Sequence, residues 1–221
     1  MSFILNIDTS GDIASICIAQ NGKSLYDDSN EKQKDHAAWL HPAINKLFQS
    51  VSVQIKDIEA IAITIGPGSY TGLRVGLATA KGLCYALKIP LITINTLEAM
   101  AFAVKKEAAD LICPMIDARR MEVFTAIYNK DLQPMLSPRA MIIDESSFAE
   151  IIAAHQILFC GSGSNKFQSI INDKNAAFSS AVADASHLAS LSFDLFCKKE
   201  FADLAYTEPL YIKEFYTPTR K

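Results

Sequence analysis

Short apolar runs closed by turn residues alternate along the chain with longer segments in which apolar residues recur every three or four positions. The short runs predict strands over 3–7, 13–19, 24–29, 58–65, 91–94, 111–116, 122–128 and 157–160. The periodic segments predict helices over 35–49, 71–87, 95–106, 146–154 and 185–199. This order of elements predicts an α/β fold with mixed sheets and flanking helices.

Each half of the chain begins with strands and proceeds to helices, which indicates a duplicated plan. We expect one lobe over residues 1–100 and a second over residues 101–221, with the last helix packing back on the first lobe. Residues 216–221 carry a proline and mixed charge, and we expect a disordered tail there.

Composition narrows the class of protein. Half of the 221 residues are apolar and a fifth are charged, the formal net charge is −3, and no run of Lys or Arg is long enough to hold nucleic acid tightly. The five scattered cysteines predict reduced core thiols, not a zinc knuckle or a disulfide framework. The N-terminus does not resemble a signal peptide and no stretch is long enough to span a membrane, so we expect a cytoplasmic protein.

A glycine-rich loop joins a predicted strand to a predicted helix. Gly66 and Gly68 bracket Pro67 and allow a tight turn, and Ser69 or Thr71 can cap the helix. The N–H groups at such a helix start suit an anion. The loop lacks both the Walker A ending and the dinucleotide spacing, so a purely structural turn explains its glycines equally well.

Two further clusters leave alternatives open. Asp8, Thr9 and Ser10 fill the turn after the first strand; they would serve a phosphate with a metal near Asp8, or they hydrogen-bond their own backbone. Charged residues also gather between two strands of the second half, where they form a surface ion-pair network or line a cleft. These residues are Asp117, Arg119, Arg120 and Glu122.

The helix after the glycine loop has an unusual face. Gly72, Gly76 and Ala80 recur every four residues, so the backbone of another helix could approach closely, with flanking apolar area from Leu73, Leu77 and Leu83. We refer to Gly72, Gly76 and Ala80 as the glycine stripe. It predicts a partner contact.

The segments 5–10 and 66–76 together resemble the TsaB (YeaZ) family, the bacterial partner subunits in making N6-threonylcarbamoyladenosine on tRNA. The resemblance continues through 35–36, 89–100 and 117–123 and ends at 209–211; the first 125 residues match well and the rest loosely. It implies a two-lobed actin-like and Hsp70-like (ASKHA) fold.

The resemblance also implies a catalytic paralogue, TsaD, which holds a metal through two histidines. Here Thr96 and Met100 stand at the corresponding positions, and neither replaces histidine as a ligand. We therefore expect no metal and no catalytic residue, with Glu122 and Arg74 acting through packing.

In the family, the first helix and the helix after the glycine loop contact TsaD. The residues of this chain that would form that interface are His36, Leu40, Leu47, Gly72, Leu73, Gly76, Leu77, Ala80 and Leu83. The vestigial phosphate loops would be formed by Asp8, Thr9, Ser10, Gly66, Gly68 and Ser69.

The resemblance further implies a set of partners. The chain would dimerise with and activate a TsaD-type catalytic subunit, meet a TsaE-type ATPase, form a homodimer when alone, and reach tRNA only through the complex. No cofactor of its own is expected, apart from weak ATP or ADP binding at or near a complex interface. The alternative is a nucleotide-dependent enzyme or a metallopeptidase-like protein of the same fold.

Overall fold

The computed structural model describes residues 1–31 and 35–213, so the predicted tail at 216–221 lies outside the described residues. Five strands form the first sheet, in the order β3-β2-β1-β4-β5. They are β1 (Phe3–Asp8), β2 (Ala14–Gln20), β3 (Lys23–Asn30), β4 (Ile58–Gly66) and β5 (Leu91–Asn95). A 3-10 turn, η1 (Ile55–Asp57), precedes β4.

The second sheet repeats this plan, in the order β10-β9-β6-β7-β8. Its strands are β6 (Leu111–Asp117), β7 (Glu122–Asn129), β8 (Pro134–Ile142), β9 (Ile157–Cys160) and β10 (Ala176–Ser179). In each sheet the first strand pairs antiparallel with the second and parallel with the fourth, so β1 and β6 hold equivalent places. The predicted duplicated α/β fold is confirmed.

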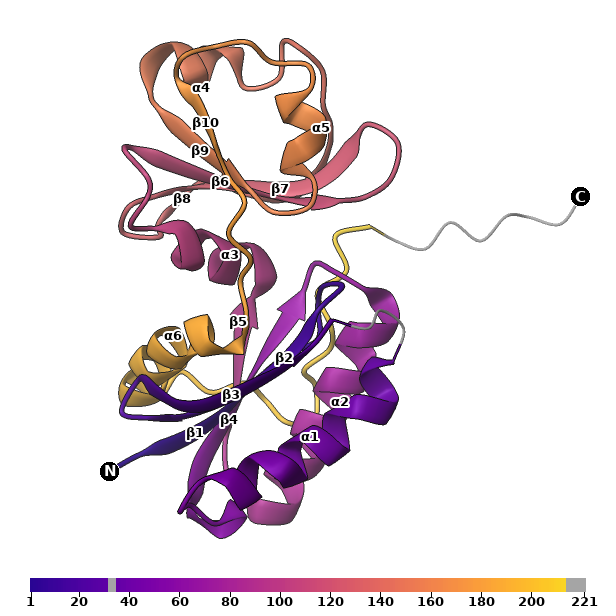
Figure 1. Ribbon diagram of the computed structural model, residues 1–221, viewed down its shortest axis with the longest axis vertical. Coiled ribbons are helices and arrows are strands. Elements are labelled where there is room, and N and C mark those ends of the chain that lie inside the picture. The colour runs from indigo at the N-terminus through magenta and orange to yellow at the C-terminus, as the bar shows by residue number, and fades with distance from the viewer. Residues whose placement is uncertain (32–34, 214–221) are drawn as a thin grey trace, which may run out of the picture.

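Helices cover both faces of the first sheet (Figure 1). Helices α1 (His36–Ser50) and α2 (Tyr70–Leu87) lie side by side on one face, and α6 (Ala185–Lys198) packs on the other. The alternation along β4 explains this, because Ile61 and Ile63 point toward α1 and α2 while Ala60 and Ala62 point toward α6. Burying each of these isoleucines contributes about 1.5–3 kcal/mol to stability.

The second lobe is covered in the same way. Helix α3 (Thr96–Val104) lies between the two sheets, and α4 (Ala149–Ala154) and α5 (Ser164–Gln168) lie on the opposite face of the second sheet. None of the helices in the described part of the chain combines the length and apolar character that crossing a bilayer requires. After α6 the chain runs back along the first lobe as residues 202–213, which we call the strap.

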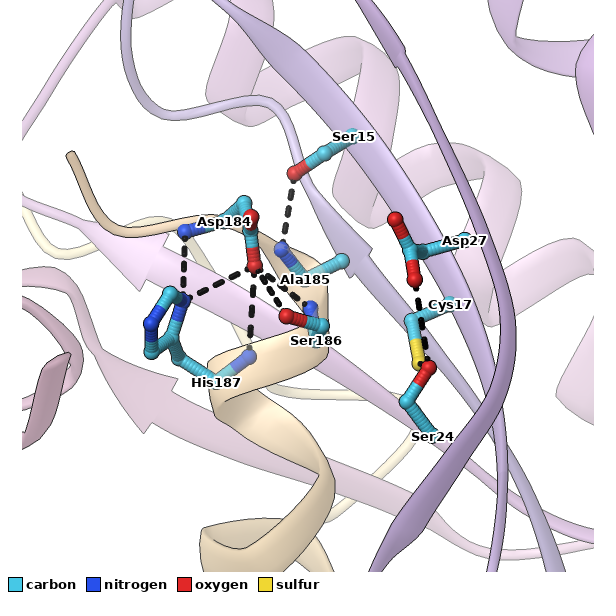
Figure 2. A network of polar contacts seen from close by, with 8 residues as sticks. All are labelled: Ser15, Cys17, Ser24, Asp27, Asp184, Ala185, Ser186 and His187. Atoms are coloured by element: carbon cyan, nitrogen blue, oxygen red, sulfur yellow. Dashed lines mark hydrogen bonds and ion pairs between the residues drawn. The ribbon is translucent and has the colours of Figure 1, made fainter.

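The start of α6 is fixed by a polar network (Figure 2). The Asp184 carboxylate accepts hydrogen bonds from the backbone N–H groups of Ser186 and His187, and it lies 2.8 Å from His187 Nδ1. The backbone N–H of Ala185 donates to Ser15 Oγ on β2 at 2.8 Å. The chain is thus anchored to the first sheet where it returns from the second lobe.

The structure differs from the predicted elements at a few places. Strands β8 and β10 were not predicted, and the helix expected from 146 begins at Ala149 because the residues before it form a turn. The helix predicted from 95 begins at Thr96, because Asn95 is its cap and accepts a hydrogen bond from the Leu97 N–H. Pro42 lies inside α1 without ending it.

Candidate functional site

A cleft of about 930 Å³ lies between the two lobes. The first lobe and α3 contribute Asp8, Ser10, Gly68, Ser69, Thr96 and Met100 to its lining, and the second lobe contributes Ile116, Asp117, Arg119, Phe124, Gly161 and Asn165. Both of the loops predicted for phosphate therefore border one cavity. Thr9 and Gly66 are not among the lining residues.

The hydroxyls of Thr9 and Ser10 and the Ser10 N–H are engaged within the protein. Asp8 Oδ1 accepts hydrogen bonds from the Ser10 N–H at 2.9 Å, from Ser10 Oγ at 2.7 Å and from Thr64 Oγ1 at 2.7 Å. Thr9 is fully buried, and its hydroxyl donates to the Gly72 carbonyl at 2.8 Å. The geometry is that of a turn that satisfies its own polar groups.

The glycine loop is held against this turn. The Ser69 N–H donates to the Ser10 carbonyl at 2.7 Å, and Ser69 Oγ accepts from the Gly72 N–H at 3.3 Å as the cap of α2. Gly66 has a φ of +123°, and a Cβ there would lie 2.6 Å from the Leu210 carbonyl oxygen of the strap. The Ser69 N–H and hydroxyl of this loop are thus engaged within the protein.

The positions that correspond to the histidines of TsaD face the cleft from α3. Thr96 and Met100 lie one turn apart there, and Thr96 Oγ1 is buried with no hydrogen-bond partner among the described residues. The Met100 methyl packs against Gly161. A hydroxyl and a thioether do not fit a metal held by histidines. Within residues 1–31 and 35–213, no group of three His, Cys, Asp or Glu could hold a metal ion.

Charged residues form ion pairs at the rim of the second lobe. Lys166 Nζ lies 2.6 Å from Asp117 Oδ1, and Glu122 pairs with Lys213 of the strap at 2.5 Å. Partial burial raises the pKa of Asp117, but the hydrogen bonds from Lys166 and from the Arg119 N–H outweigh it, so this pKa lies below its usual value. The hairpin turn between Asp117 and Glu122 contains Arg119 and Arg120, which have φ values of 70° and 50°.

The glycine stripe of α2 faces the interior of its own lobe and not solvent. Gly72, Gly76 and Ala80 are buried inside their own lobe, and a Cβ on Gly72 or Gly76 would overlap Thr9. The leucines expected beside a partner are buried as well, at positions 40, 47, 73 and 77, while Leu83 is half-buried. His36 is buried too, with Nε2 3.1 Å from the Gly11 carbonyl oxygen. These residues hold α1 and α2 to the sheet.

A second stripe of small residues on α2 does face solvent. Ala78, Gly82 and Ala86 recur every four residues and are exposed, and a Cβ on Gly82 would have no atom within 4 Å. On α1, the helix beside α2, the exposed residues include Ala38, His41, Pro42 and Asn45. We call these seven residues the outer face. The two helices meet at His41, whose Nε2 lies 3.4 Å from Thr79 Oγ1.

Comparisons with known proteins agree with this architecture. The family model described as "TsaD: tRNA N6-adenosine threonylcarbamoyltransferase" matches residues 30–207. The TsaB protein of tRNA threonylcarbamoyladenosine biosynthesis from Bacillus subtilis is 34% identical over 125 residues, which are 57% of this chain and 54% of that protein. The chain thus spans about half the length of this curated relative.

Other similarities extend over the whole chain. A TsaB protein from Buchnera aphidicola subsp. Baizongia pistaciae is 26% identical over 219 residues, which are 96% of this chain and 98% of that protein. A crystal structure from Pseudomonas aeruginosa, of a protein with similarity to peptidase YeaZ, superposes with a TM-score of 0.86 at 25% identity and covers 96% of this chain and 100% of that one. The chain belongs to the TsaB (YeaZ) family of TsaD-related ASKHA proteins.

Proposed function

We propose that the chain is a non-catalytic subunit that dimerises with and activates a TsaD-type transferase in forming N6-threonylcarbamoyladenosine on tRNA. Its relatives are named for the biosynthesis of this modified nucleoside. The observation that carries the proposal is the outer face of α1 and α2.

The outer face has the composition of a helix-packing surface. None of its residues carries a formal charge when His41 is neutral, and the cores of protein interfaces are depleted of charged residues. Small side chains at Ala78 and Gly82 permit a close approach of a partner helix. Tyr85, on the same helix, is 78% exposed and would supply an aromatic anchor at the edge.

The cleft supports the non-catalytic part of the proposal. Asp8 Oδ1, the Thr9 hydroxyl and the Ser10 N–H and hydroxyl make hydrogen bonds within the protein. Thr96 and Met100 offer no ligand set for a TsaD-type metal. The chain would therefore act through the surface that it presents to the transferase.

The remaining partners follow from the same proposal. The chain alone pairs with a second copy through the outer face, and a TsaE-type ATPase joins the complex with the transferase. The net charge of −3 favours tRNA contact through the complex and not through this chain alone. The chain has no cofactor of its own, and ATP or ADP binds weakly at or near the complex interface.

Size-exclusion chromatography with the TsaD-type subunit tests the interface. We expect Gly82→Leu to weaken association at least about tenfold, because a large side chain separates the helices at their closest point. Gly82→Ala is the matched control and should leave association within about twofold of wild type. Association that survives Gly82→Leu unchanged would place the interface elsewhere.

A nucleotide-dependent enzyme or a metallopeptidase-like protein is the second candidate, favoured by the cleft and the Asp8 and Ser10 wall that borders it. Isothermal titration of the isolated chain with ATP and Mg²⁺, together with metal analysis, separates the two. Micromolar ATP binding or a stoichiometric metal would support this candidate and count against a non-catalytic subunit.

A further inference from the structure

The strap is fastened to the first lobe along most of its length. Near its start, the Ala202 N–H donates to the Leu91 carbonyl on β5 at 2.8 Å. Near its end, the Leu210 N–H donates to the Ile65 carbonyl on β4 at 2.7 Å. These bonds attach residues 202–210 to strands of the first sheet.

Side-chain and packing contacts fix the strap between these two bonds. The Lys81 ammonium of α2 donates to the carbonyls of Ala205 and Thr207, at 3.2 and 3.1 Å. The Leu210 carbonyl packs directly on Gly66, where no side chain stands. The strap is therefore held in register on the first lobe, because it cannot slide without breaking several of these contacts together.

The last described residue of the strap reaches the second lobe. Lys213 Nζ contacts both carboxylate oxygens of Glu122, at 2.5 Å to Oε1 and 2.6 Å to Oε2. Glu122 begins β7, and its side chain is only 19% exposed. The carboxylate of the pair is thus largely shielded from solvent, while the Lys213 ammonium is half-exposed.

This ion pair lies beside the cleft, since neither Lys213 nor Glu122 lines it but residues near Glu122 do. Residues 179–183, which carry the chain from the second lobe back to α6, line the cleft. Asp117 and Arg119, close to Glu122 in the β6–β7 hairpin, line it as well. Figure 1 shows the strap approaching the second lobe on the side away from α3 and α6.

We propose that the strap is a brace across the cleft, in which the Lys213–Glu122 pair holds the two lobes at their present separation. When the pair breaks, the lobes open about α3 and α6. Because Lys213 is half-exposed, salt screens the pair and favours the open state. The Lys213–Glu122 pair thereby controls how far the cleft between the lobes is open.

Double electron–electron resonance between spin labels on the two lobes measures this opening. Cysteines introduced by Gln49→Cys on α1 and Glu150→Cys on α4 take the labels, in a Cys197→Ser background that removes the exposed native thiol. Labelled chain is mixed with an excess of unlabelled chain, so that distances within one molecule dominate.

We expect one narrow distance distribution for the parent at low salt. Lys213→Ala and Glu122→Gln should each add a longer distance, and about 1 M salt should do the same to the parent. Lys166→Ala is the matched control, because it removes an ion pair of the same rim that stays within the second lobe. The proposal is overturned if Lys213→Ala and Glu122→Gln, both folded by circular dichroism, keep the distribution of the parent.

Discussion

Replacing glycine by alanine at two positions of α2 tests which side of this helix faces the sheet. At Gly76 the new Cβ would overlap Thr9 Oγ1 and lie 3.0 Å from Ile63 Cδ1. Overpacking of this kind costs about 1–3 kcal/mol. If Thr9 turns away, its hydrogen bond to the Gly72 carbonyl is lost, which costs about 1 kcal/mol more. Alanine returns about 1 kcal/mol through helix propensity, which leaves a net loss of about 1–3 kcal/mol.

The same change at Gly82 meets no atom within 4 Å, so only the propensity gain of about 1 kcal/mol remains. The two variants should therefore differ by about 2–4 kcal/mol in free energy of unfolding. Urea titration followed by circular dichroism measures this difference through the midpoints, provided that the slopes agree. Gly76→Ala with a stability equal to that of Gly82→Ala would refute the packing of α2 described above.

Three smaller perturbations test other parts of the structure. Burial raises the pKa of Cys17, Cys84 and Cys160 to about 12, and it raises the pKa of Cys113 as well. At about pH 8 a thiol reagent should therefore modify one cysteine per native chain, Cys197, and none in Cys197→Ser. Several rapid modifications would contradict the described core. The hydrogen bond with Asp184 raises the pKa of His187, so protonated His187 stabilises the fold below about pH 6.5 and this contribution is lost as the pH rises through the raised value. Because the His187–Asp184 pair is partly exposed, we expect urea titrations to show a pH-dependent change in stability of less than about 1 kcal/mol. His187→Gln should abolish this pH dependence. A pH dependence that is unchanged in His187→Gln would mean that another group causes it. Ser69→Ala removes the cap of α2 and should cost about 1 kcal/mol in the same titration, while no loss would mean that the cap contributes nothing.

Most of the fold could be predicted from local patterns, since apolar runs marked eight of the ten described strands. The two missed strands lack those signals. Strand β8 contains Pro134 and Pro138, which a central strand would exclude but an edge strand tolerates. Strand β10 has four residues, none of them β-branched.

The orientation of α2 could not be predicted from its sequence. Small residues recur every four positions twice on this helix, as the buried glycine stripe and as the exposed series at Ala78, Gly82 and Ala86. Arg74 and Lys81 are the charged residues between Tyr70 and Leu87, so no strongly polar face marks the solvent side. The contact between Thr9 and Gly72 shows that the glycine stripe is the buried series. This contact joins residues that are far apart in the sequence, so no local pattern predicts it.

The candidate site shows the same limit. That Asp8, Ser10, Gly68 and Ser69 border one cleft follows from the parallel pairing of β1 and β4, whose ends lie together. The Lys213–Glu122 pair joins residues that are 91 positions apart in the sequence, so no local pattern predicts it.

Reconstitution of the modification tests the central proposal most directly. The TsaD-type subunit of the same organism would be supplied with threonylcarbamoyl-adenylate and tRNA, and N6-threonylcarbamoyladenosine measured by mass spectrometry after nuclease digestion, with and without this chain. A non-catalytic activator predicts no product from the chain alone and a large increase when it is added to the transferase, with most of that increase lost in Gly82→Leu and kept in Gly82→Ala. Modification by the isolated chain, or transferase activity that is indifferent to its presence, would contradict the account.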